Sequence, residues 1–244
     1  MARAYIIAAL PRTGSYRLCE MLMDAGCGYP QEYGPREDVA TWRDFHGFAN
    51  HRAYFHYFLR AGRSPSGLFG CKLMWPQFTA LREDIASYLR ITGIGLVPFE
   101  AALGSVSIIF LQRRNRLMQA ISLYRAMHSG IWSSRVVSER AHPVYDRGGI
   151  ADALEVIGSN SRLWERFFAD HAVRPCRIWY EDLIAGDTDA VFDAIGVDRR
   201  PVRPGLLQRQ ADDESFLWHD RFIVESGIDD EGGTGSAQVS LHAL

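Results

Sequence analysis

One stretch near the N-terminus, from Tyr5 to Cys19, constrains what this chain of 244 residues can fold into. Its first part, Tyr5 to Leu10, is a short apolar run that suits a parallel strand covered on both faces. Pro11 ends the run, and Gly14 allows a sharp turn. Apolar residues then recur at helical spacing, at Leu18, Leu22 and Ala25. The stretch therefore predicts a buried strand, a tight turn and the first turns of a helix.

The predicted turn has the properties of an anion-binding loop. Backbone amides and the positive end of the helix dipole point into it, which is how many chains hold phosphate. It differs from a Walker A loop, because the Gly-Lys-Ser/Thr ending is missing and the cation, Arg12, stands before Gly14. We infer an anion site that works without a metal. The alternative interpretation is an ordinary strand-to-helix turn with no ligand.

Length and composition indicate an ordinary globular protein. No linker-like stretch divides the chain, so we expect a single domain over residues 1–225. Residues 226–244 carry glycine, acidic and small residues without periodicity, which predicts a loose C-terminal tail. The formal net charge of −2 argues against a nucleic-acid partner held by a basic field. Any anion site must therefore be local.

Cysteine, histidine and apolar residues are distributed as in a soluble cytoplasmic protein. The four cysteines form no CxxC pair, which predicts reduced core residues. His51 and His56 do not share one helix face, so we expect no metal site. The N-terminal apolar run is broken by Pro11 and does not resemble a signal peptide. No apolar run approaches the roughly 20 residues of a membrane span, so we expect no such span.

Four apolar segments alternate with helical patterns along the chain. After Tyr5 to Leu10 come Leu68 to Met74, Val106 to Leu111 and Cys176 to Tyr180. This alternation predicts an α/β fold with a doubly wound parallel sheet and helices on both faces. In such sheets ligands bind where the loops leave the carboxyl ends of the strands.

Two charged residues are predicted near this edge of the sheet. The segment from Gly26 to Pro35 is rich in glycine and proline, which predicts an irregular loop that carries Glu32 close to the anion. The alternative is an ordinary surface acid. Lys72 lies inside the second apolar segment, so its ammonium reaches either solvent or the anion. The aromatic residues of 38–60 either pack on the core as helix faces or form, in part, a wall for a sugar.

Three arginines directly follow the third apolar segment, within Gln112 to Arg116. Guanidinium groups suit phosphate oxygens. A helix that begins beside Arg114 can also bring the hydroxyl of Ser122 to the same anion. We interpret Arg114 and Ser122 as a second anion-binding pair, and the alternative is a solvated run of charge.

Several motifs occur together in the order known from one family. They are Pro11–Ser15, Pro30–Tyr33, Phe69–Trp75, Arg114 with Gln119–Ala126, Tyr180–Leu183 and Arg209–Asp212. In this combination the chain resembles the Stf0 family of bacterial sulfotransferases. The resemblance implies a P-loop-like fold, 3′-phosphoadenosine 5′-phosphosulfate (PAPS) as co-substrate, and transfer of its sulfuryl group to a carbohydrate or glycolipid hydroxyl. It also implies a homodimer.

The resemblance further implies roles for individual residues. The 5′-phosphosulfate would be held by Arg12, Thr13, Gly14, Ser15 and Tyr16. The 3′-phosphate would be held by Arg114 and Ser122, with Arg209 and Gln210 also near the nucleotide. Glu32 would act as the general base, while Arg12 stabilises the departing 5′-phosphate. We assign the acceptor side of the site to Gln31, Tyr33, Lys72 and Trp75.

Tyr16 departs from the family pattern, which usually has a small hydroxyl residue directly after the serine. A phenol cannot offer the same short hydroxyl to the phosphate, although its amide can still donate. This departure motivates a second hypothesis, a catalytically silent protein that binds a glycan or PAP, the adenosine 3′,5′-bisphosphate that PAPS leaves behind. A P-loop phosphotransferase is a third hypothesis, which the missing Gly-Lys-Ser/Thr ending disfavours.

Overall fold

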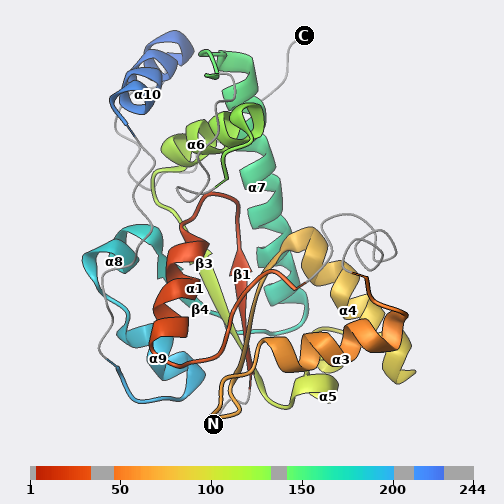
Figure 1. Ribbon diagram of the computed structural model, residues 1–244. Coiled ribbons are helices and arrows are strands. Elements are labelled where there is room, and N and C mark those ends of the chain that lie inside the picture. Colours follow the sequence, from red (N-terminus) through yellow and green to blue (C-terminus); the bar gives the residue numbers. More distant parts are fainter. Residues whose placement is uncertain (1–3, 34–46, 133–141, 201–211, 228–244) are drawn as a thin grey trace.

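The computed structural model of the chain describes residues 4–33, 47–132, 142–200 and 212–227. At its centre is a sheet of four parallel strands (Figure 1). They are β1 (Ala4–Ala9), β2 (Phe69–Met74), β3 (Val106–Gln112) and β4 (Cys176–Trp179). The strand order is β2-β1-β3-β4. The predicted α/β fold with a parallel sheet is therefore confirmed.

The central strand β1 explains why the N-terminal run is continuously apolar. Ile6 lies opposite Cys71 of β2 on one side and Ile108 of β3 on the other. Alternate side chains point to opposite faces of a strand. Every residue of β1 is buried, with Ala4, Ile6 and Ala8 in one apolar core and Tyr5, Ile7 and Ala9 in the other. A strand covered on both faces has no solvent side, so it needs no polar alternation.

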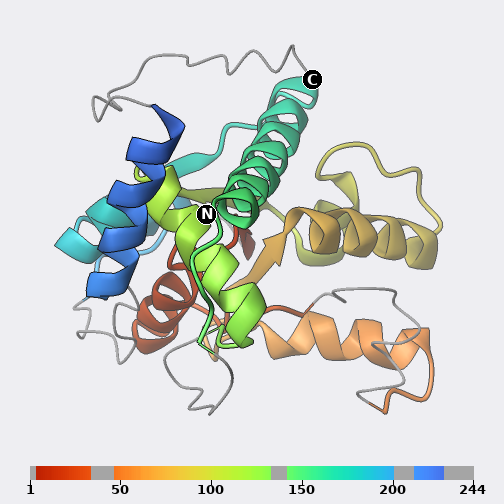
Figure 2. The ribbon, with the colours of Figure 1, turned by 90° about the horizontal axis from the view of Figure 1, so that it is seen from above.

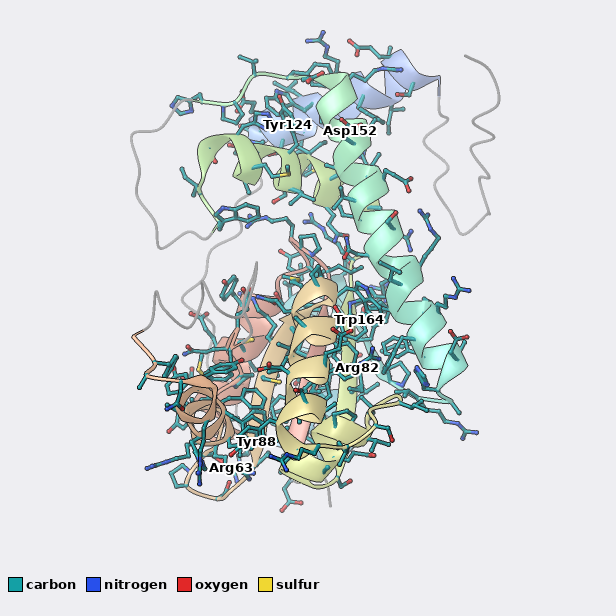
Figure 3. All side chains as sticks on the ribbon, turned by 90° about the vertical axis from the view of Figure 1, so that its right-hand side faces the viewer. Arg63, Arg82, Tyr88, Tyr124, Asp152 and Trp164 are labelled. Carbon is teal, nitrogen blue, oxygen red and sulfur yellow. The ribbon has the colours of Figure 1, made fainter. Side chains whose placement is uncertain are left out.

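Helices cover both faces of the sheet, as the doubly wound pattern predicts. One face packs against α1 (Ser15–Asp24), α8 (Tyr180–Ala185) and α9 (Asp189–Ile195). The other packs against α3 (His51–Ala61), α4 (Trp75–Leu89), α5 (Val97–Leu103) and α7 (Arg147–Asp170). Figure 3 shows Trp164 and Arg82 where α7 and α4 meet. The rings of Trp164 and Phe78 lie 4.8 Å apart there, so aromatic packing joins the two helices.

Two further helices, α6 (Arg116–Ser129) and α10 (Asp213–Ser226), lie above the carboxyl ends of the strands (Figure 1). Seen from above in Figure 2, α10 runs alongside α6. Tyr124 of α6 packs against Trp218 of α10, with ring centroids 6.0 Å apart. Its ring also approaches Gly149 near the start of α7, where a Cβ would lie 2.4 Å from the Tyr124 Cε2 atom. The described helices include none that is long and apolar enough to cross a bilayer.

The structure extends two helices beyond the ranges that periodicity predicts. α4 begins at Trp75 rather than near Thr79, because Gln77 accepts a hydrogen bond from the Met74 amide and so caps the first turn. α7 begins at Arg147 rather than near Ser159, because the apolar face of its first half is buried in the core. In both cases tertiary contacts or a cap decide where the helix starts, and the spacing of apolar residues does not reveal them.

Candidate active site

The loop between β1 and α1 is held in one conformation by several contacts. Arg12 and Gly14 both have a left-handed backbone, with φ of 62° and 74°. The buried hydroxyl of Thr13 donates to the carbonyl of Leu10 at 2.8 Å. Gln119 of α6 donates its side-chain amide to the carbonyl of Pro11 at 2.6 Å. A non-glycine residue in this backbone region costs about 1 kcal/mol, so the surrounding contacts must stabilise Arg12 there.

Gly14 is required by the approach of a neighbouring ring. A Cβ at this position would lie 2.5 Å from the Cδ2 atom of Tyr180, which follows β4. The guanidinium of Arg113, which follows β3, lies 5.0 Å from the centroid of the same ring. The ends of β1, β3 and β4 thus converge. Strand order reverses between β1 and β3, and open α/β sheets bind ligands at such a switch point.

The start of α1 has the features of an anion site. Gly14 is the N-cap residue, and no side chain of the described residues caps the helix. The Thr13 hydroxyl, which stands next to the cap, is directed to Leu10 instead. The first amides of α1 and the positive end of its dipole therefore face the loop, as at other helix N-termini that bind phosphate.

Arg12 brings a desolvated positive charge to the same place. Its Nε donates to the hydroxyl of Ser122 on α6 at 2.9 Å, and its Nη1 donates to the carbonyl of Trp132 at 2.5 Å. Burial lowers the pKa of Arg12 to about 10, and the charge of Arg113 acts in the same direction. Two guanidinium groups that repel each other in a water-poor loop favour an anion between them. The loop therefore fits a phosphate or sulfate ester.

Glu32 lies at the same sheet edge because its segment continues the sheet. The amide of Lys72 donates to the carbonyl of Gln31 at 3.0 Å, and Gln31 pairs with Cys71 as a short parallel bridge beside β2. This pairing directs the Glu32 side chain toward α1 and α4. One carboxylate oxygen, Oε1, accepts from the Tyr16 hydroxyl at 3.3 Å, and the other, Oε2, accepts from Gln77 Nε2 at 3.2 Å. The expected proximity of Glu32 to the anion loop is thus observed, through Tyr16.

Lys72 forms an ion pair with Glu32 Oε1. Its side chain is fully buried, so the expectation that its tip could reach solvent is wrong. The ammonium lies 3.5 Å from the centroid of the Tyr16 ring. Because a buried ammonium needs compensation, the carboxylate and the ring face together account for its position inside a strand.

Arg114 and Ser122, the expected anion-binding pair, have different hydrogen-bond partners in this structure. Arg114 makes two hydrogen bonds of 2.7 Å to the carboxylate of Asp182, and its guanidinium lies 5.2 Å from the Trp179 ring centroid. Ser122 accepts from Arg12, and no hydrogen bond joins Ser122 to Arg114. Glu181 accepts from the Arg114 amide at 3.1 Å, next to the start of α6. The assignment of both residues to one phosphate therefore stays a prediction.

The residues assigned to the acceptor differ in their exposure. Gln31 is exposed. Tyr33 is buried, and its hydroxyl donates to the carbonyls of Tyr29 and Ala61. Trp75 packs edge-on against Trp164 with centroids 5.1 Å apart. Of the aromatic residues expected to pack as helix faces, Tyr54, Phe55 and Phe58 do so from α3. Arg209 and Gln210 lie outside the described residues.

Sequence reasoning assigned no role to three residues that shape the site, although two of them, Gln119 and Tyr180, begin motifs of the family resemblance. Gln77 contacts Glu32, Gln119 holds the loop at Pro11, and the ring of Tyr180 covers Gly14. Gln77 had a detectable signal, because it stands three positions after the end of a strand, where a capping glutamine belongs. The other two act over more than a hundred residues of sequence, and no local pattern indicates such contacts. No group of metal-ligating side chains occurs within the described residues.

Comparisons with known proteins identify the family of the chain. A family model described as Stf0 sulphotransferase matches residues 4–225. A trehalose 2-sulfotransferase of Mycobacterium tuberculosis is 29% identical over 255 residues, which cover 92% of this chain and 96% of that protein. A trehalose 2-sulfotransferase of Mycolicibacterium smegmatis is 29% identical over 250 residues, which cover 90% and 94%. The resemblance seen in the motifs is confirmed, and the chain belongs to the Stf0 sulphotransferase family.

Proposed function

We propose that this protein transfers a sulfuryl group from PAPS to a hydroxyl of a carbohydrate, with Glu32 as the general base. One observation carries the proposal. Tyr16, in the first turn of α1, contacts Glu32, so a carboxylate lies beside the helix start that follows the arginine loop. A base next to an anion-binding helix N-terminus is what proton removal beside a sulfonate donor requires.

The donor would be held chiefly by the loop after β1. Arg12 and the amides of Thr13 to Tyr16 would bind the 5′-phosphosulfate, and Arg113 would add a second cation from the end of β3. The Thr13 hydroxyl is already bonded to Leu10, so its contribution is its amide. Arg114 and Ser122 remain our candidates for the 3′-phosphate, with Arg209 and Gln210 nearby.

The chain's residues would divide the reaction between them. The acceptor oxygen forms a bond to sulfur while the bond from sulfur to the 5′-phosphate oxygen breaks. Glu32 takes the proton of the acceptor hydroxyl. Arg12 and the α1 amides stabilise the charge left on the 5′-phosphate. The products are a sugar sulfate ester and PAP, and the reaction needs no further reagent.

The acceptor class follows from the relatives. Both relatives reported above are named trehalose 2-sulfotransferases, so trehalose is the first acceptor to test. Gln31 is the exposed member of the four assigned acceptor residues, and we keep it as a direct contact. Tyr33, Lys72 and Trp75 would then shape the site from behind it. Glycolipids that carry the same sugar are the second acceptor class.

The test is an acceptor screen with isotopically labelled PAPS, read by mass spectrometry for an added sulfate. We expect the wild-type protein to sulfate trehalose or a related sugar. Glu32→Gln should lower turnover by about 100-fold or more, because the base is lost. PAP affinity, measured by calorimetry, should stay nearly unchanged in this variant.

Each alternative outcome has a distinct meaning. Unchanged turnover in Glu32→Gln would remove Glu32 from the base role. Tight PAP binding without sulfate transfer to any acceptor would favour the silent binding protein. Magnesium-dependent turnover of ATP would favour the phosphotransferase.

A further inference from the structure

The groups around Glu32 come from three elements that are far apart in the sequence. Tyr16 belongs to α1, Lys72 to β2 and Gln77 to α4. Lys72 and Tyr16 both contact Oε1, and Gln77 contacts Oε2. Both oxygens of one carboxylate are thereby fixed by side chains whose own positions are set by regular structure.

We propose that Tyr16, Lys72 and Gln77 are positioning residues that keep Glu32 ionised and fix the direction of its carboxylate. The inference deepens the proposed function and rests on it for the role of Glu32 as base. The side chains of the three residues act through Glu32 and are not assigned a contact with the reacting atoms, while the backbone amide of Tyr16 keeps its separate place in the donor loop.

Gln77 can only donate to Glu32. The amide of Met74 donates to Gln77 Oε1 at 2.9 Å, and a backbone amide has no acceptor. This bond directs the side-chain oxygen toward Met74 and the NH2 group toward Glu32. Gln77 is buried, so it cannot turn to water without breaking the cap of α4. It therefore favours a carboxylate oxygen that accepts, which is the ionised form.

The positive charge of Lys72 also favours the ionised form of Glu32. An ammonium has three donors and no acceptor, so it pairs with an ionised carboxylate and not with a carboxylic acid. Its nitrogen has no hydrogen-bond partner among the described residues beyond the Glu32 ion pair. Protonation of Glu32 would leave a fully buried cation without its counter-charge, which is costly. The pair therefore resists loss of the Glu32 charge.

Tyr16 separates the ion pair of Lys72 and Glu32 from solvent. Its ring covers the Lys72 ammonium, which has no exposed surface, while Tyr16 itself is 42% exposed. A cation over an aromatic face is strongest where water is excluded. The hydroxyl of the same residue donates to Glu32. One side chain thus stabilises both members of the ion pair.

A further titratable group that faces the pair is the thiol of Cys19 on α1, which the carboxylate of Glu20 also influences. Beside the larger effect of burial, the charge of Lys72 lowers the pKa of this thiol, and the charge of Glu32 raises it. Burial raises the pKa of Cys19 to about 12, so the thiol stays neutral in the working range of the enzyme. The neutral Cys19 therefore adds no charge beside Glu32, and Lys72, Tyr16 and Gln77 are the neighbours through which we propose that its ionisation is controlled.

The experiment measures the ionisation of Glu32 directly. Protein with ¹³C-labelled glutamate is titrated by NMR, and the Glu32 carboxyl signal is identified by its loss in Glu32→Gln. Lys72→Met should raise the midpoint by about one pH unit or more. Tyr16→Phe, which keeps the ring over Lys72, and Gln77→Leu should raise it by a few tenths of a unit each. Tyr54→Phe is the matched control, because its buried hydroxyl bonds to the Tyr33 carbonyl and not to Glu32.

Activity provides the second readout. The acidic limb of the kcat/KM profile should move by the same amount as the NMR midpoint in each variant. PAP affinity should stay constant in Gln77→Leu, because Gln77 is not assigned to the nucleotide or to the acceptor. Midpoints equal to that of the wild type in Tyr16→Phe and Gln77→Leu would overturn the inference, and both changes are mild enough to leave a folded protein. If the wild type transfers no sulfate but the midpoints move, the proposed function fails and the positioning role stands.

Discussion

At the scale of single residues, Arg114 shows how an anion-binding candidate is held before its ligand arrives. A guanidinium has five N–H donors. Asp182 takes two of them, which leaves an edge of Arg114 for a phosphate. The hydrogen bonds to Asp182 raise the pKa of Arg114, so the cation is permanent. Its side chain is half exposed, at the rim of the sheet edge rather than inside it.

We predict that Arg114→Ala weakens PAP binding by about tenfold, while binding of adenosine 5′-phosphate, which lacks the 3′-phosphate, changes little. Calorimetry with both nucleotides tests this. Arg177→Ala is a matched control, because Arg177 also grips a carboxylate with two bonds, to Glu165, and also lies over a ring. Equal losses for the two nucleotides in Arg114→Ala would refute the 3′-phosphate assignment.

At the scale of elements, α6 links the anion loop to α10. Ser122 of α6 holds Arg12, and Arg125, one turn further on, holds the start of α10. Asp212 caps α10 through the Ser215 amide and also accepts two hydrogen bonds from Arg125. Arg125 lowers the pKa of Asp212. The contribution of this pair to stability is therefore present above the unfolded pKa of Asp212 and is lost only as pH falls through the lower folded value.

We predict that Arg125→Met loosens α10 locally. Removing a half-buried cation with four hydrogen bonds should cost about 1–2 kcal/mol, less than a fully buried pair because Asp212 and Glu214 are partly exposed. Amide exchange of residues 213–226 should accelerate, while α4 amides remain protected. Arg162→Met removes an ion pair that is exposed on both sides and should have almost no effect. An equal increase of the amide exchange rate in α10 and in α4 would show that the substitution destabilises the whole protein and would contradict a local role.

At the scale of the whole molecule, two apolar cores share one sheet. Ile6 and Ile7 are neighbours in β1, both fully buried, yet they belong to opposite cores. The two cores pack on opposite faces of the same four strands. If one core unfolds, the sheet loses packing on that face, and the other core is destabilised with it. The single domain over residues 1–225 stays a prediction, and we propose from this arrangement that the two cores unfold together.

We predict that Ile6→Ala and Ile7→Ala each lower the free energy of unfolding by about 2–5 kcal/mol. Both variants should keep one transition in urea, with the same midpoint by tryptophan fluorescence and by circular dichroism. Two separate transitions in either variant would show that the faces unfold independently.

Much of the fold could be predicted because its signals are local. The apolar run ending at Pro11, the turn at Gly14 and the alternation of strands and helices depend on residues close in the chain. The early start of α7 could not be predicted, because the apolar face of its first half gains stability only from tertiary packing in the core, chiefly against α6. The site divides in the same way into predictable and unpredictable parts. The sequence placed Arg12 and Glu32 at one edge of the sheet, but it did not predict that Gln77 contacts Glu32 or that Tyr180 covers Gly14.

The sequence by itself determined the α/β class and the arginine loop after β1, since both rest on residue type and short-range spacing. The assignment of Glu32 as the candidate base came from the resemblance of its motif to the Stf0 family. Only the tertiary structure decided the partners of the charged groups. It paired Lys72 with Glu32 under the Tyr16 ring, Arg114 with Asp182, and Ser122 with Arg12. The physical reason is that an ion pair or hydrogen bond forms between the groups that the fold brings within a few ångströms of each other. These groups are far apart in the sequence, so local patterns do not predict which of them meet.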